Sequence, residues 1–157
     1  MIKLTIAQAS AEDVDDLAPL FDAYRQFYEQ ASNVRLAHTY LSERLANDES
    51  VLFIARGADG TAVGFTQLYP SFCSVEAQKA WVLYDLYVSS NARRQGVAEQ
   101  LMNAAQRFAN QSGACWLRLE TAHSNIPGQT LYEKLGWEKD EDFYTYFYHL
   151  ADDEDAD

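Results

Sequence analysis

An apolar segment followed by a basic, glycine-containing turn is the part of this sequence best suited to bind an anion. Trp81–Val88 is apolar apart from Asp85, and the turn Arg93–Ala98 (RRQGVA) follows it at the start of a helical pattern. At such a junction, successive backbone N–H groups and the positive end of the helix dipole face a ligand. Gly96 permits close approach of the backbone, and the two adjacent arginines add charge that suits a pyrophosphate. An ordinary helix start with surface arginines is the alternative.

Other phosphate- and metal-binding motifs are absent from the sequence. There is no GxxxxGK[ST] segment for a nucleoside triphosphate and no GxGxxG segment for a dinucleotide. The three histidines show neither HxxxH nor HExxH spacing, so no metal site is predicted. Cys73 and Cys115 lie far apart without CxxC spacing, which argues against zinc and against a disulfide framework. We interpret them as buried thiols in a reducing compartment.

Composition and charge indicate one acidic globular domain. The chain has 157 residues, is 48% hydrophobic and 23% charged, and carries a net charge of -12; this length supports a core without disulfides or structural metals. The acidic field repels phosphate backbones, so nucleic acid is excluded as a partner, and cationic small molecules or basic peptides are favoured. No apolar run suits a signal peptide or a membrane span, so we expect a cytoplasmic protein without membrane attachment. Residues 1–150 are predicted to form the domain, and residues 151–157 an acidic, disordered tail.

Strand and helix patterns alternate along the chain and predict a mixed α/β fold with helices on both faces of a sheet. Ile2–Ala7 has the period of a half-buried strand, Ser10 caps a helix that runs to about Gln30, and Trp81–Val88 is typical of a central strand buried on both faces. The remaining expected elements are a helix over Leu36–Leu45, a hairpin of Val51–Arg56 and Ala62–Tyr69, a helix within Arg93–Gln111, a strand over Cys115–Glu120, a helix over Asn125–Leu135 and a last strand over Phe143–Leu150, with Trp137–Lys139 as an optional extra strand.

Two segments resemble the signatures of the GNAT superfamily of N-acetyltransferases. Arg93–Ala98 matches the family pattern (Arg/Gln)-x-x-Gly-x-(Gly/Ala), directly after a strand that ends in DLYV. Asn125, followed by LYEKLGW at residues 131–137, is similar to the family's C-terminal Asn…LYEKLGF segment. The expected element order also fits the family fold along nearly the whole chain. DLYV and the Arg25–Tyr28 region look more like the branch of yeast histone/polyamine-type and amino-acid acetyltransferases.

The resemblance implies an acyl-CoA N-acyltransferase fold. In this fold a central mixed, mostly antiparallel sheet splays apart between two parallel strands, here those that end near Val88 and Glu120. Acetyl-CoA would place its pyrophosphate on the backbone of Arg94–Ala98, and its pantetheine arm would pair like a strand with Leu86–Val88. Asn125 resembles a cofactor-contacting asparagine, with a helix N-cap as the alternative. The implied cofactor-binding residues are Leu86, Tyr87, Val88, Arg93, Arg94, Gln95, Gly96, Val97, Ala98, Asn125 and Tyr132.

Two residues are implied to be catalytic. Tyr132 matches the family tyrosine that protonates the departing CoA thiolate; with a thiol pKa of about 8.5 and a phenol pKa of about 10, it contributes mainly hydrogen bonding unless the site shifts either pKa. Asp85 is the best candidate to receive the proton of the amine, because it is the one carboxylate in an apolar strand and burial would raise its pKa. A structural partner for a buried arginine is the alternative. Some relatives place a glutamate one position earlier, where this chain has Tyr84; Glu120 is a weaker candidate, with a solvated strand end as its alternative.

Aromatic side chains are the candidates for the wall of an acceptor pocket. Aromatic rings with acidic neighbours attract an aminium group through cation–π contacts. For any one of these residues, packing in the core or on the surface is the alternative. The candidates are Tyr24, Phe27, Tyr28, Tyr40, Tyr69, Tyr144 and Tyr146, with Tyr24, Tyr28, Asp85 and Glu120 as the predicted substrate-binding set.

The sequence therefore predicts an acetyl-CoA-dependent N-acetyltransferase in which a primary amine attacks the thioester directly. The acceptor is a small cationic amine, a polyamine, an amino acid or a basic peptide, and an acyl group other than acetyl is left open. A non-catalytic module that binds acetyl-CoA as a sensor or regulator is the alternative. Phe143–Leu150 is a candidate strand for pairing across a homodimer interface.

Overall fold

The computed structural model describes residues 3–151. The chain forms two compact units, residues 1–120 and residues 121–157. The predicted tail falls almost wholly on residues 152–157, which lie outside the described residues, and so does the start of the first predicted strand at Ile2. No helix within residues 3–151 is both long and apolar enough to cross a bilayer.

The first unit holds most of the regular structure, and the second holds one helix. The elements of the first unit are β1 (Thr5–Gln8), the short helix η1 (Ala11–Asp13), α1 (Val14–Phe27), α2 (Val34–Ala46), β2 (Val51–Arg56), β3 (Ala62–Cys73), β4 (Gln78–Val88), the short helix η2 (Ser90–Ala92), α3 (Val97–Ser112) and β5 (Leu117–Arg118). The second unit contains α4 (Ile126–Lys134). The predicted mixed α/β class is confirmed.

The five strands form one sheet in the order β1-β2-β3-β4-β5. Neighbours from β1 to β4 are antiparallel, and β5 runs parallel to β4. The sheet is thus mixed and mostly antiparallel, as expected, but the predicted strand Cys115–Glu120 is reduced to two residues. The hairpin of β3 and β4 is longer than predicted and continues past Pro70. A proline is tolerated there because β2 begins at Val51, opposite Leu68. Beyond Leu68, β3 therefore has no neighbour on that side among the described residues.

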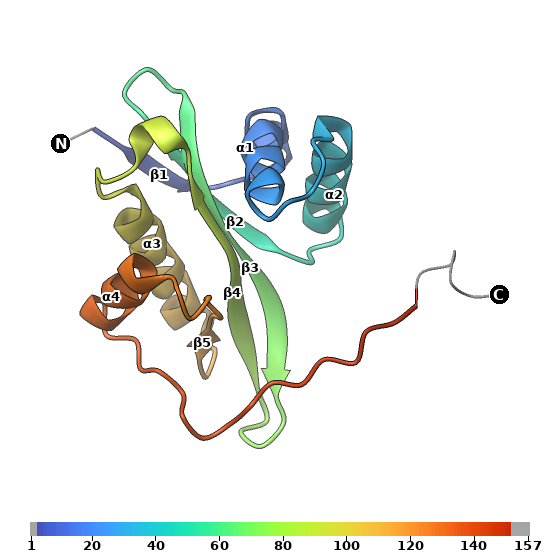
Figure 1. Cartoon of the computed structure of the whole chain (residues 1–157), viewed down its shortest axis with the longest axis vertical. Helices are drawn as coiled ribbons and strands as arrows, with labels where there is room; N and C mark the ends of the chain where they lie inside the picture. The colour runs from blue at the N-terminus through green and yellow to red at the C-terminus, as the bar shows by residue number, and fades with distance from the viewer. Residues whose placement is uncertain (1–2, 152–157) are drawn as a thin grey trace. The chain divides into compact units, whose positions relative to one another are not determined.

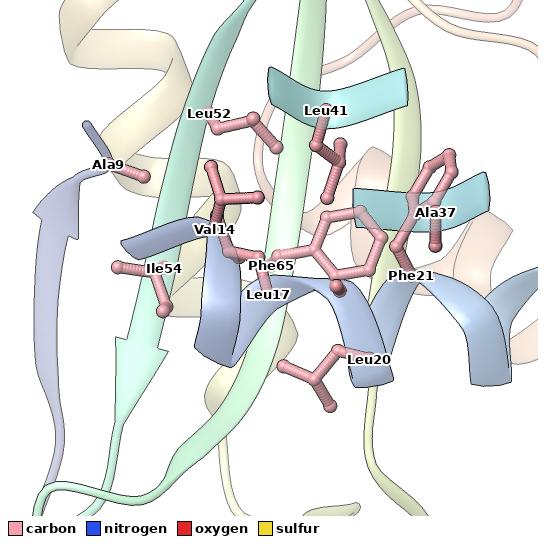
Figure 2. Close-up of a cluster of buried hydrophobic side chains, with 11 residues drawn as sticks. Ala9, Val14, Leu17, Leu20, Phe21, Ala37, Leu41, Leu52, Ile54 and Phe65 are labelled. Atoms are coloured by element: carbon pink, nitrogen blue, oxygen red, sulfur yellow. The ribbon is translucent and has the colours of Figure 1, made fainter. Parts of the chain in front are cut away.

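Helices α1 and α2 cover one face of this sheet, and α3 covers the other (Figure 1). On the first face, apolar residues of α1 and α2 pack on β2 and β3, and Figure 2 shows Phe21, Leu17 and Leu41 gathered around Phe65. Phe65 is 1% exposed. Helix α1 ends at Phe27 rather than at Gln30, because Glu29 adopts a left-handed conformation with φ of 66° that cannot continue a helix.

On the second face, α3 packs closely against the strands because β3 carries a glycine there. A Cβ atom on Gly64 would lie 2.9 Å from the backbone oxygen of Tyr87 and 3.1 Å from Val97. The glycine therefore lets the start of α3 approach the C-terminal end of β4, where Val88 pairs with Gly64. This contact brings the end of a strand and the start of a helix together.

The last strands predicted from the sequence are not present. Residues 137–139 and 143–150 have no strand conformation, and the side chains of 143–150 are all exposed. Aromatic residues favour strands, but a strand also needs a neighbour for its backbone N–H and C=O groups. Within residues 3–151, no backbone–backbone hydrogen bond involves residues 143–150. The expectation for this segment was wrong because propensity alone does not supply a partner.

Candidate functional site

Most of β4 lacks a partner on one edge. Its parallel neighbour β5 pairs only through Trp81 with Leu117 and Val82 with Arg118, whereas β4 continues to Val88. Figure 1 shows the short β5 beside one part of the long β4. A strand edge with unpaired N–H and C=O groups is a template for an extended ligand. The segment predicted to hold a pantetheine arm, Leu86–Val88, lies on this open edge.

The turn after β4 forms a concave array of backbone N–H groups. Arg94 has φ of 63° and Gly96 has φ of 80°, so two residues with positive φ flank Gln95 just before α3. Within residues 3–151, the N–H groups of Gln95, Gly96, Val97 and Ala98 donate to no other backbone group. Such an arrangement at a helix N-terminus binds anions. A positive φ in a non-glycine residue such as Arg94 is uncommon and concentrates at functional sites.

The two arginines of this turn have different surroundings. The Nε–H of Arg93 donates to the backbone oxygen of Val88 at 3.0 Å, and its guanidinium lies 5.6 Å from the ring centre of Tyr87. Arg93 therefore ties the turn to the end of β4. The side chain of Arg94 is exposed and has no contact of this kind among the described residues. It is the arginine free to meet an anion.

A bulge in β4 places two neighbouring side chains on the same face of the sheet. The register shifts at this point, with Gln67 opposite Asp85 and Leu68 opposite Leu83, so Tyr84 has no partner on β3. An extra residue of this kind interrupts the alternation of side chains between the two faces. The ring of Tyr84 lies 5.3 Å from that of Tyr69, and Asp85 contacts α1. Both therefore face the side of the sheet that carries α1 and α2.

Asp85 is a buried carboxyl group without a cationic partner. It is 4% exposed, and its Oδ2 accepts a 2.8 Å hydrogen bond from Nε2 of Gln67. The neighbouring hydroxyl of Tyr24 also acts to lower the pKa of the carboxyl. No arginine or lysine within residues 3–151 forms an ion pair with it, so the alternative role as partner of a buried arginine is not observed. Burial raises the pKa of Asp85, and the hydrogen bonds oppose that rise only in part.

Tyrosines from both covering helices surround Asp85. Tyr24 of α1 and Tyr69 of β3 both have a pKa raised above the ordinary phenol value, chiefly through burial and also through the nearby Asp85 carboxylate. Tyr40 of α2 and Tyr69 share a 2.6 Å hydrogen bond between their hydroxyls. Tyr28 packs edge-on against Tyr24 and is 61% exposed. The hydroxyls of Tyr24 and Tyr69 thus stay neutral beside a carboxyl.

Asp22 holds the segment between the two helices in place. This aspartate of α1 is 3% exposed, and its carboxylate accepts hydrogen bonds from Nε2 of Gln26, Oγ of Ser32 and the backbone N–H of Asn33 at 3.0, 2.8 and 2.7 Å. The side chain of Asn33 in turn caps α2 by accepting from Leu36 N–H at 3.0 Å. The connection between α1 and α2 is therefore held in place by a buried carboxylate.

Other predicted site residues lie elsewhere. Glu120 is exposed at the end of the first unit, and Phe27 is 66% exposed and contacts Tyr28. Tyr144 and Tyr146 belong to the exposed segment of the second unit. The structure thus brings Asp85 together with Tyr24, Tyr28, Tyr40 and Tyr69, and does not add Glu120 to them.

Of the two predicted residues of the second unit, Asn125 precedes α4 and Tyr132 lies within it. Asn125 is its N-cap: Oδ1 accepts from the N–H of Gly128 at 3.2 Å, and Nδ2 donates to Thr121 Oγ1 at 2.9 Å. The ring of Tyr132 lies 6.4 Å from that of Trp137. The capping role, one of two readings of Asn125, is observed; its contact with a cofactor stays a prediction.

Gln67 and the bulge were not found from the sequence. Gln67 is 0% exposed, and its Oε1 is buried without a hydrogen-bond partner among the described residues. A polar residue inside the apolar run Ala62–Tyr69 was the available signal. The bulge leaves no such signal, because a register shift depends on the pairing of two strands.

Comparisons with known proteins agree with this geometry. The sequence profile described as the acetyltransferase (GNAT) family matches residues 16–137. An uncharacterised N-acetyltransferase YhfO of Bacillus subtilis strain 168 is 44% identical over 143 residues, which cover 91% of this chain and 95% of that protein. The crystal structure of a probable acetyltransferase superposes with a TM-score of 0.89 and 38% identity, covering 94% and 99% of the two chains. The aminoglycoside N-acetyltransferase AAC(6')-Iy in complex with CoA shares the fold, with a TM-score of 0.78, 22% identity, and 96% and 97% coverage.

Replacing Asp85 with asparagine should stabilise the protein near neutral pH. The pKa of Asp85 is raised above the ordinary aspartate value of 3.8. The carboxyl therefore favours folding below about pH 4, and this contribution to stability is lost as the pH rises through the folded-state pKa. Asp85→Asn removes that loss, so the free energy of unfolding should increase by about 1 kcal/mol at pH 7. Urea unfolding at several pH values measures it, and the gain should shrink toward pH 4.

Asp22→Asn is the matched control, since the two aspartates are equally buried. The carboxylate of Asp22 accepts three hydrogen bonds, and an asparagine would place its NH2 group, itself a donor, among these donors. The variant should therefore lose about 1–3 kcal/mol of stability at pH 7. Equal losses for both variants would show that the Asp85 carboxylate is held by interactions as favourable as those of Asp22.

Proposed function

The chain belongs to the GNAT family of acetyltransferases and is an N-acetyltransferase, and from this premise we propose that it transfers the acetyl group of acetyl-CoA to a primary amine of a small cationic molecule. The observation that carries the proposal is the junction of an open strand edge with an array of backbone N–H groups, at Leu86–Val88 and Gln95–Ala98. Both features suit the same ligand, which has an amide-containing arm and a pyrophosphate.

In the proposed complex, the backbone of Gln95–Ala98 binds the pyrophosphate, with Arg94 beside it. The open edge of Leu86–Val88 exchanges hydrogen bonds with the amide groups of the pantetheine arm. Acetyl-CoA supplies an acetyl group activated as a thioester. The AAC(6')-Iy structure, which has this fold and is in complex with CoA, supports the choice of cofactor. No metal takes part in the proposed reaction.

Asp85 is proposed to accept the proton that the acceptor must lose before it can attack. An amine enters as an aminium cation, and the buried carboxylate takes its proton directly or through a water molecule. The neutral nitrogen then forms the C–N bond while the C–S bond breaks and the thiolate leaves. The acylated nitrogen releases its second proton to water as the amide forms, which balances the proton that the thiolate takes up. Tyr132 is proposed to hydrogen-bond or protonate that thiolate. The raised pKa of Asp85 brings it closer to the pH at which a general base is most effective.

A cationic acceptor is favoured by the charge and the aromatic content of the Asp85 cluster. The whole chain has a net charge of -12, and the tyrosine rings offer π faces to an aminium group. Polyamines, amino acids and basic peptides carry positively charged aminium groups, as do the aminoglycosides named for AAC(6')-Iy. We further propose a cytoplasmic location, a single acetyltransferase domain over residues 1–150, and a homodimer in which residues 143–150 of each copy find a strand partner.

The first experiment is to measure free-thiol release from acetyl-CoA with a panel of polyamines, amino acids, aminoglycosides and lysine-rich peptides, alongside calorimetric titration of acetyl-CoA alone. Release with one amine class identifies the acceptor. Binding of acetyl-CoA without release across the panel would favour a sensor over an enzyme of this substrate class. Absence of binding would contradict the proposal.

Gly96→Glu should weaken acetyl-CoA binding at least tenfold, because a carboxylate would repel the pyrophosphate from the N–H array. Gly60→Glu is the matched control. Gly60 also has a left-handed φ, of 86° against 80° for Gly96, and a Cβ atom meets nothing within 4 Å at either position. Both variants thus carry similar backbone strain, and only Gly96→Glu should change the affinity measured by calorimetry. An equal loss in both would attribute the effect to strain.

Asp85→Asn should lower kcat roughly 100-fold or more and remove the rise of activity with increasing pH. The physical reason is that an amide cannot accept the proton of the aminium group. Asp22→Asn serves again as control, because it alters an equally buried aspartate and should keep the pH profile of the original protein. An unchanged profile in Asp85→Asn would assign proton transfer to water or to another base.

Tyr132→Phe should reduce kcat roughly tenfold while leaving acetyl-CoA affinity nearly unchanged, since only the interaction with the departing thiolate is removed. Tyr148→Phe, at a tyrosine that is 90% exposed in the same unit, is the control and should be fully active. Full activity of Tyr132→Phe would show that the hydroxyl has no role in the reaction and that Tyr132 serves to pack against Trp137.

A further inference from the structure

Two cysteines that are distant in the sequence meet at one end of the β3–β4 hairpin. Sγ of Cys73, a carboxylate oxygen of Glu76 and Sγ of Cys115 all lie within 4.8 Å of one another. Cys73 ends β3, Glu76 lies in the turn before β4, and Cys115 lies between α3 and β5. The prediction from cysteine spacing failed to anticipate this, because sequence separation does not measure distance across a sheet.

Backbone hydrogen bonds hold these three segments around the start of β4. Cys73 is paired with Gln78 in the antiparallel register. On the other side of β4, the N–H of Cys115 donates to the backbone oxygen of Lys79 at 2.9 Å. The turn with Glu76 is closed by a 3.1 Å bond from Ala77 N–H to Ser74 O. The two sulfur atoms and the carboxylate therefore lie close together because backbone hydrogen bonds of the sheet hold their segments.

The cluster lacks a cation among the described residues. Glu76 forms no ion pair with lysine or arginine within residues 3–151. Three groups that all become anionic on deprotonation are thus held together, an arrangement that a bound divalent cation would stabilise.

We propose that Cys73, Glu76 and Cys115 bind one zinc ion, with water as the fourth ligand. Zinc accepts thiolate and carboxylate ligands in tetrahedral geometry, whereas magnesium and calcium prefer oxygen alone. With Zn–S bonds of about 2.3 Å, tetrahedral geometry separates the two sulfur atoms by about 3.8 Å. The side chains are already within 1 Å or so of that spacing, so small rotations suffice.

A disulfide between the two cysteines fits the backbone less well. Cys73 and Cys115 lie on opposite sides of β4, so their backbones are two strand spacings apart, roughly 9.5 Å. Bridged cysteines have Cα atoms within about 7 Å. A metal ion between the two sulfur atoms adds two metal–sulfur bonds to the link between the cysteines. It can therefore join Cys73 and Cys115 without moving the strands.

The zinc site would fasten the hairpin to the loop before β5 and would lie far from the proposed reaction. Gln78 and Val88 are the two ends of β4, an 11-residue strand roughly 30 Å long. The proposal does not depend on acetyl transfer, and zinc should leave turnover unchanged. A loss of zinc binding with normal turnover, or the reverse, would therefore separate the two proposals.

The test uses the purified full chain, treated with a chelator and a reductant and then titrated with Zn²⁺ against a chromophoric chelator. We expect one zinc per chain with a Kd in the micromolar range or tighter, and a rise in Tm of roughly 5 °C at saturating zinc. Titration with Co²⁺ should give the sulfur-to-metal charge-transfer absorption of a site with thiolate ligands.

Three variants locate the site. Cys73→Ser and Cys115→Ser should each abolish the charge-transfer absorption and weaken zinc binding at least 100-fold, and Glu76→Gln should weaken it about tenfold. Glu138→Gln, at an exposed glutamate of the second unit, is the control and should bind like the original protein. Binding that survives both serine variants, or no binding to the original protein, would overturn the proposal. So would mass spectrometry that finds Cys73 and Cys115 joined as a disulfide, with no thiol left to bind zinc, in protein purified without reductant.

Discussion

The arrangement of the whole sheet depends on a strand that is longer than its neighbour. β4 pairs along its length with β3 but meets β5 over two residues only, and backbone groups without partners in a protein normally find water or a ligand. The end of β4 then leads into a turn whose N–H groups at Gln95–Ala98 also find no backbone partner in the described part of the chain. The fold thus concentrates its unsatisfied donors and acceptors at one junction, and Gly64 makes the junction compact by letting α3 approach the strand.

A second constraint is the bulge at Tyr84, which turns two consecutive side chains toward the same helices. In a regular strand, Tyr84 and Asp85 would lie on opposite faces. The bulge places the carboxyl in a cluster of tyrosines, where burial raises its pKa. The same carboxyl that costs stability is therefore the one suited to accept a proton, as is common for groups at functional sites.

The sequence predicted well what depends on local pattern and poorly what depends on pairing. The turn Arg93–Ala98 and the isolated carboxylate Asp85 were visible as residue types at the expected spacing, and β2 was predicted with its observed bounds. Gln67 and the meeting of Cys73 with Cys115 depend on register across strands, which residue order does not state. The aromatic segment 143–150 shows the converse: its β-propensity is strong, yet no strand forms among the described residues, because a strand is a property of two segments.

Under the proposed function, the buried carboxylate of Asp22 has a consequence for recognition of the acceptor. By accepting hydrogen bonds from Ser32 and Asn33, it orders the connection between α1 and α2 through contacts within the protein itself. A loop that is already ordered loses little conformational entropy when a small molecule binds. Under the proposed function, the free energy of each contact with the acceptor would then appear as affinity, and selectivity among amines would be set by the shape of an ordered wall rather than by its ability to adapt.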